Sequence, residues 1–201
     1  MLKFPGATGA IMQGLVDAPA GGFDWYAPTR DSVLAQSRII EAGEQLAARI
    51  AHLQQTSGLA GSQTVLVGFS QGATIALELA RRHADRVAIV VACGGRMLPS
   101  LKAGEPIRAA IHLIHGLLDT VTPATHARQA YGRLRGAGAK VSLDLIEDLG
   151  HSISQDVIII GTTRTLQSIF SGRRIRIGSR SGASDPTLPS MTASLHPQSG
   201  A

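Results

Sequence analysis

The pattern of apolar and polar positions alternates between short β-branched runs and longer helical segments. Strand-like apolar runs occupy residues 10–16, 64–67, 87–92, 111–114 and 141–146. Helical patterns occupy residues 31–55, 73–83 and 123–135, with Asp31 or Thr29 as the expected N-cap of the first and Pro123 as the first residue of the third. Strands that alternate with helices of this length predict an α/β fold with a mostly parallel sheet.

Residues 156–170 fit two structures. Their β-branched residues favour a strand, whereas one helical face could be formed by Val157, Ile160, Leu166, Ile169 and Phe170.

Composition predicts one folded domain over residues 1–170 and a disordered tail over residues 171–201. The net charge of +5 owes much to this tail, which is rich in Ser, Gly, Pro and Arg. A basic tail could contact RNA or anionic lipid, but a solvated tail without a partner is the preferred interpretation. We therefore predict no nucleic-acid partner.

The sequence indicates a soluble cytoplasmic protein without cofactor or metal. Its apolar runs are too short to span a bilayer, and its single cysteine, Cys93, excludes an internal disulfide. No His, Cys and Asp cluster has metal-ligand spacing, and the glycine-rich stretches lack the spacing of nucleotide-binding loops. The oligomeric state is not predicted.

Gly68-Phe69-Ser70-Gln71-Gly72 lies between a predicted strand and a predicted helix. A G-x-S-x-G sequence in this context forms a sharp turn that exposes the serine hydroxyl, with the N–H of Gln71 as an oxyanion donor. An ordinary glycine-bracketed turn is the alternative. The flanking elements favour a nucleophilic Ser70.

Two later strand ends carry the remaining candidates. Asp119 follows residues 111–114, where its alternative role is a helix cap, and His151 follows residues 141–146. In parallel sheets the carboxyl ends of the strands form the site, and the order Ser70, Asp119, His151 is that of a hydrolase triad on such a sheet. His115 is expected to line the site without taking part in the chemistry.

With these motifs, the chain resembles the carboxylesterase/acyl-protein thioesterase branch of the α/β-hydrolases, the phospholipase/carboxylesterase family. The resemblance rests on residues 68–72, on His115 to Pro123 (HGLLDTVTP), on Leu-Gly-His at 149–151 and on residues 19–26. It implies an α/β-hydrolase fold and the hydrolysis of small carboxylic esters or thioesters through an acyl-enzyme.

The chain also departs from the family pattern at both ends. Members have an upstream strand with a His-Gly-x-Gly-like loop that provides a second oxyanion donor, and nothing similar precedes residue 10. We therefore expect an N-terminally truncated α/β-hydrolase. Residues 156–170 match only partly the amphipathic helix that follows the histidine in the family.

The leading hypothesis is a serine hydrolase with Phe69, Trp25 and Leu117 as candidate substrate-binding residues. The alternative is a catalytically impaired remnant that keeps the hydrolase scaffold as a binding or interaction module. An intact triad favours the enzyme, and the missing oxyanion loop favours the remnant.

Overall fold

The computed structural model describes residues 6–19, 21–99 and 107–171. In chain order the elements are β1 (Val16–Asp17), β2 (Phe23–Asp24), α1 (Ser32–Ser57), a 3-10 turn (Gly61–Gln63), β3 (Val65–Phe69), α2 (Gln71–Arg82), β4 (Ile89–Cys93), β5 (Ala110–Gly116), α3 (Thr125–Gly136), β6 (Val141–Ile146) and α4 (Gln155–Ser171). The predicted tail lies outside the described residues.

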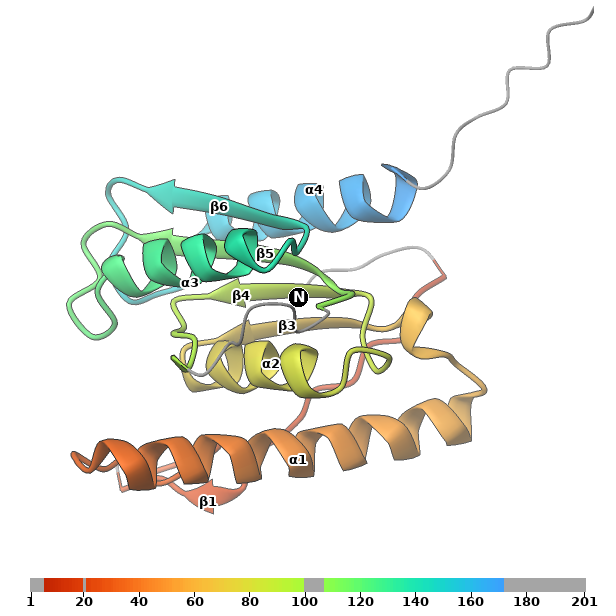
Figure 1. The fold of residues 1–201 in the computed structure, drawn as a ribbon, viewed down its shortest axis with the longest axis horizontal. Coiled ribbons are helices and arrows are strands. Elements are labelled where there is room, and N and C mark those ends of the chain that lie inside the picture. Colours follow the sequence, from red (N-terminus) through yellow and green to blue (C-terminus); the bar gives the residue numbers. More distant parts are fainter. Residues whose placement is uncertain (1–5, 20, 100–106, 172–201) are drawn as a thin grey trace, which may run out of the picture.

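The centre of the fold is a four-stranded sheet in the order β3-β4-β5-β6 (Figure 1). All three pairings are parallel, and the register aligns Phe69 with Cys93 and Cys93 with Ile114. The strand ends that carry Ser70, Asp119 and His151 therefore lie along one edge of the sheet. The predicted parallel α/β arrangement is confirmed.

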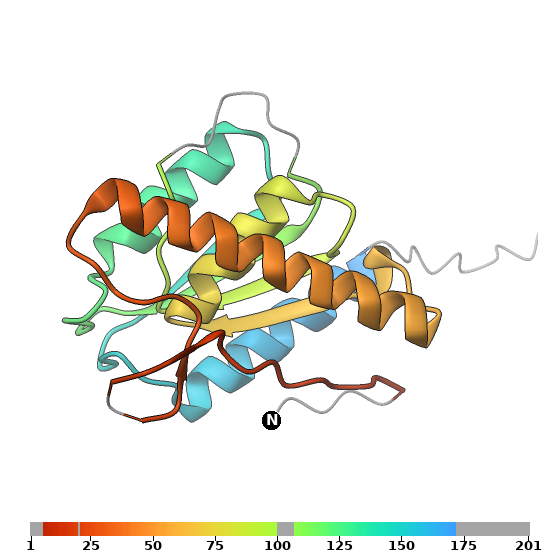
Figure 2. The ribbon, with the colours of Figure 1, turned by 90° about the horizontal axis from the view of Figure 1, so that it is seen from below.

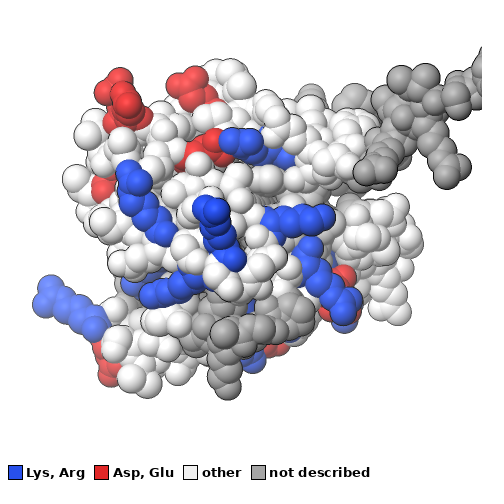
Figure 3. Space-filling model, turned by 45° about the horizontal axis from the view of Figure 1, so that its top comes forward, with Lys and Arg blue, Asp and Glu red and all other residues white. Residues whose placement is uncertain are grey.

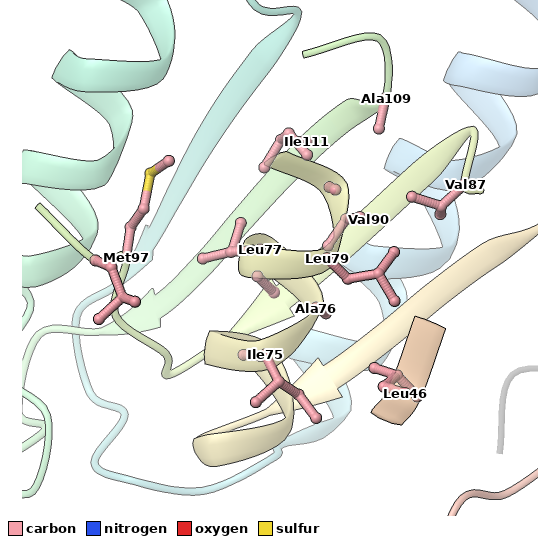
Figure 4. Packing of buried hydrophobic residues seen from close by; sticks show 14 of the residues in the cluster. Leu46, Ile75, Ala76, Leu77, Leu79, Val87, Val90, Met97, Ala109 and Ile111 are labelled. Atoms are coloured by element: carbon pink, nitrogen blue, oxygen red, sulfur yellow. The ribbon is translucent and has the colours of Figure 1, made fainter. Parts of the chain in front are cut away.

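Helices cover both faces of the sheet. Figure 2 shows α2 and α3 on one side and α4 on the other, with α1 packed against α2. Between α2 and the sheet lies the main core, in which Ile75 and Leu79 of α2 pack with Val90 of β4 and Ile111 of β5 (Figure 4). These side chains are almost completely buried. Burial of this apolar surface holds α2, and therefore the turn before it, against the strand ends.

Helix α1 begins where the sequence predicts. The Asp31 carboxylate accepts the backbone N–H groups of Val33 and Leu34 at 2.8 and 3.0 Å and caps the helix. Helix α3, in contrast, begins at Thr125 and not at Pro123, because Ala124 is its N-cap.

The strand predicted over residues 10–16 is wrong. Only Val16 and Asp17 form a strand, and they pair with β2 in a small antiparallel ladder. The segment before them is held by other contacts, including Leu15 N–H to Asp24 O at 2.7 Å and the Arg49 guanidinium to Gln13 O at 3.0 Å. In the part of the chain described, β3 pairs only with β4, so residues 10–15 do not join the main sheet.

Residues 155–171 form a helix, which resolves the ambiguity left by their composition. Helix α4 packs on β4 and β5, with Val157, Gly161 and Thr165 buried. The expected face is only partly correct, because Leu166, Ile169 and Phe170 are exposed. The close approach of Gly161 to Val91 and Ile114 explains the difference, since small residues let the helix lie near the sheet.

Charge is unevenly distributed on the surface. Figure 3 shows several Lys and Arg side chains on one face of the molecule. Helix α3 carries three arginines and no acidic residue; the arginines are Arg128, Arg133 and Arg135. No helix among the described residues is both long and apolar enough to cross a membrane.

Candidate active site

Ser70 lies in a strained turn between β3 and α2. Its φ of 53° makes it the one non-glycine residue with positive φ in the described part of the chain. The turn is tight, since a Cβ added at Gly68 would lie 2.5 Å from the backbone of Gly72. Backbone strain of this kind persists where the surrounding packing imposes it, and it is common at functional sites.

The structure brings Ser70, His151 and Asp119 together into a hydrogen-bonded chain. Ser70 Oγ lies 2.9 Å from His151 Nε2, and His151 Nδ1 lies 2.7 Å from Asp119 Oδ2. Because a carboxylate only accepts, Nδ1 carries the proton, which leaves Nε2 free to accept from the hydroxyl. This tautomer is the one that a general base for Ser70 needs.

Asp119 is buried and fully engaged by hydrogen bonds. Only 5% of the residue is exposed. Its Oδ1 accepts the backbone N–H groups of Val121 and Thr122 at 2.9 and 2.7 Å. Burial raises the pKa of this carboxyl, but the hydrogen bonds from His151, Thr122 and Val121 outweigh it and hold the pKa below its usual value. The group is therefore an anion at neutral pH and caps its own turn, not α3.

Close backbone packing places the His151 loop. Gly116 ends β5 where the chain at Leu149 and Gly150 passes so near that an added Cβ would lie within 2.7 Å of Gly150 O. Leu118 N–H also donates to Leu149 O at 2.9 Å, which joins the Asp119 turn to the His151 loop. The two loops thus form one unit at the carboxyl edge of the sheet.

Phe69 packs against His151. Their ring centroids are 4.8 Å apart with an interplanar angle of 36°. The contact limits the positions open to the imidazole ring, so Phe69 adjoins the candidate base itself.

The Gln71 side chain links α2 to the loop that precedes α1. Its Oε1 accepts the backbone N–H groups of Trp25 and Tyr26 at 2.9 and 3.3 Å. Trp25 lies over the start of α2, where its indole nitrogen would be 3.3 Å from a Cβ added at Gly72. The backbone N–H of Gln71 opens the helix and has no intrahelical acceptor. Sequence reasoning considered only this N–H and missed the side chain's contacts.

The remaining predicted residues are more peripheral. Leu117, on the turn after β5, is 40% exposed.

Cys93, at the end of β4, is buried, and burial raises the pKa of its thiol to about 12. A thiol with that pKa stays protonated at neutral pH and is a poor nucleophile. Across the described ranges no group of three or more His, Cys, Asp or Glu is placed to hold a metal ion.

Comparison with known proteins identifies the family. A phospholipase/carboxylesterase family profile matches residues 10–161. The chain belongs to the phospholipase/carboxylesterase family. The resemblance based on its motifs is confirmed, and membership supports a hydrolase function.

Similar proteins include named esterases. Esterase YpfH of Escherichia coli (strain K12) is 40% identical over 104 residues, which are 52% of this chain and 44% of the relative. This chain thus spans less than half the length of that relative. The crystal structure of esterase PE8 matches with a TM-score of 0.70 at 29% identity, over 77% of this chain and 75% of that one.

A carboxylesterase from Mesorhizobium loti shares the fold, with a TM-score of 0.67 at 21% identity over 77% of this chain and 73% of that one. The α/β-hydrolase fold is therefore shown. The helix that family members have after the histidine is present as α4, packed on the sheet. The family profile ends inside this helix, at residue 161, so the expected departure after that point stays a prediction.

Sequence reasoning did not predict the hydrogen-bond partners of the two buried histidines of β5. His115 lies next to Asp119, and His112 bridges Ser142 of β6 and Ser168 of α4 at 2.8 Å each. The apolar residues around them, Ile111, Leu113 and Ile114, indicate a buried strand and give no sign of these partners.

Proposed function

We propose that this protein is a serine esterase that cleaves small carboxylic esters or thioesters through an acyl-enzyme. The observation that carries the proposal is the continuous chain from Ser70 Oγ to His151 to the Asp119 carboxylate, at 2.9 and 2.7 Å. Family membership supports the same class of reaction.

In the first half of the proposed reaction, His151 Nε2 takes the hydroxyl proton as Ser70 Oγ attacks the carbonyl carbon. The carbonyl oxygen becomes an oxyanion, which the N–H of Gln71 at the start of α2 stabilises. The tetrahedral intermediate collapses, and His151 gives its proton to the leaving alcohol or thiol. An acyl ester on Ser70 remains.

In the second half, His151 removes a proton from water as its oxygen attacks the acyl carbon. The bond to Ser70 Oγ then breaks, His151 returns the proton to Oγ, and the acid is released. Asp119 keeps the imidazole in the required tautomer and stabilises its charged form. Phe69 packs against His151, and Trp25 contacts the start of α2 next to Ser70. With Leu117, they are candidates for contacts to the substrate. The backbone N–H groups of Trp25 and Tyr26 donate to Gln71 Oε1, so they are not available to bind the oxyanion.

The test is labelling of the purified chain with a fluorophosphonate probe, alongside turnover of p-nitrophenyl acetate and butyrate. We expect labelling of the native chain and its loss in both Ser70→Ala and His151→Ala. Circular dichroism of each variant verifies that it is folded. A folded native chain that is neither labelled nor active would overturn the proposal and favour the alternative, a binding module on a hydrolase scaffold.

A further inference from the structure

The Asp119 carboxylate contacts a second histidine besides His151. His115 belongs to β5 and is only 2% exposed. Its Nε2 lies 2.6 Å from the carbonyl oxygen of Thr122 and 3.3 Å from Asp119 Oδ2. A carbonyl oxygen only accepts hydrogen bonds, so this Nε2 carries a proton.

His115 closes a small ring of contacts around the Asp119 turn. Its N–H donates to Thr122 O, and Thr122 N–H donates to Asp119 Oδ1. The same imidazole nitrogen lies 3.3 Å from Oδ2, the oxygen that accepts from His151 Nδ1. His115 thus holds Thr122, whose N–H in turn holds the other carboxylate oxygen.

We propose that His115 is a positioning residue for catalysis, which holds the turn around Thr122, and with it the Asp119 carboxylate, in place for His151. The inference rests on the proposed serine esterase function. It adds a fourth side chain to the three of the hydrogen-bonded chain from Ser70 to Asp119. His115 reaches no substrate and acts through Asp119 alone.

Loss of His115 has a consequence for Asp119. Without His115, the turn around Thr122 would lose its hydrogen bond to β5, and the Thr122 N–H that donates to Oδ1 would be less well placed. The carboxylate would then be less well oriented toward His151 Nδ1.

The chain offers a matched pair of variants. His115→Leu fills similar space but has no N–H. In His115→Gln the side-chain amide keeps a donor at about the position of Nε2. Packing against β4 and β6 is disturbed in both, so a difference between them reports on the hydrogen bond.

For p-nitrophenyl butyrate, we expect His115→Leu to lower kcat about tenfold, because a buried hydrogen bond that orients Asp119 is lost, with little change in KM. His115→Gln should restore most of kcat. Equal defects in both variants, or native behaviour of His115→Leu, would overturn the proposal.

A second measurement does not depend on turnover. In a Ser70→Ala background, the NMR resonance of the proton on His151 Nδ1 reports on its hydrogen bond to Asp119 Oδ2. This resonance should move with His115→Leu and keep its native position with His115→Gln. An unchanged resonance in His115→Leu would contradict the role of His115 even if the native chain is a good esterase. A moved resonance in a chain without esterase activity would instead leave His115 in its positioning role and reject the proposed reaction.

Discussion

At the scale of single residues, Gly68 is a position beside Ser70 where one added methyl group should have a large local effect. An added Cβ would lie 2.5 Å from the carbonyl carbon and oxygen of Gly72 and 2.6 Å from Ala73 N, all backbone atoms of α2. We predict that Gly68→Ala lowers the free energy of unfolding by about 1–3 kcal/mol, the cost typical of overpacking. It should also slow fluorophosphonate labelling, because the Ser70 turn must shift.

The matched control is Gly132→Ala in α3, where an added Cβ meets nothing within 4 Å. Alanine in a helix interior is favoured over glycine by about 0.5–1 kcal/mol, so this variant should be slightly more stable. Urea unfolding of both variants tests the pair. Equal stabilities would show that the turn at Ser70 tolerates a side chain at residue 68.

At the scale of elements, His112 joins α4 to the sheet. Its Nδ1 and Nε2 lie 2.8 Å from the hydroxyls of Ser142 on β6 and Ser168 on α4. Burial lowers the pKa of His112 below its ordinary value of 6.5, and the nearby Arg164 guanidinium lowers it further against the opposing effect of Asp144. The folded protein therefore binds a proton here less readily than the unfolded chain does.

This difference in proton binding predicts how the free energy of unfolding changes with pH. Above about pH 6.5 both states are neutral at this histidine, and it contributes no slope. As the pH falls from 6.5 towards the lower folded pKa, the unfolded state gains protons first, and the free energy of unfolding decreases. We predict that His112→Asn reduces this acid sensitivity in denaturation curves between pH 7 and 5. His52→Asn, on the exposed surface of α1, should keep the native slope, and an unchanged slope in His112→Asn would reject this explanation.

At the scale of the whole molecule, β3 is an edge strand of the described sheet and carries an exposed apolar side chain. Among the described residues β3 pairs only with β4, and its Val67 is 55% exposed. An apolar strand with an open edge is a template for pairing with another chain. We predict that Val67→Lys lowers self-association on warming, as measured by light scattering at several protein concentrations.

Val33→Lys is the control, because Val33 is more exposed but lies on α1, away from any strand edge. A purely general effect of added charge would change both variants equally. Reduced association in Val67→Lys alone would assign the effect to the strand edge.

Sequence alone determined the elements whose signals are local, and it singled out the three residues that the structure brings together. Asp31 caps α1 with its own side chain, and Gly68 to Gly72 form a turn whose sterics depend on adjacent residues. Ser70, Asp119 and His151 could be proposed because parallel strands bring their carboxyl ends to one edge. Each of these inferences needs only the chain's own neighbours and a general rule of sheet topology.

Tertiary structure decided whatever depends on a partner distant in sequence. Residues 10–16 have a strand-like pattern, but a strand needs an edge to pair with, and only Val16 and Asp17 find one, in β2. Helix α4 buries Gly161 and Thr165, not its large apolar residues at 166–170, because the surface of β4 and β5 determines which face fits. The partners of His115 are set by how β5 and the following turn fold back on each other. A pattern of residue types does not predict these contacts.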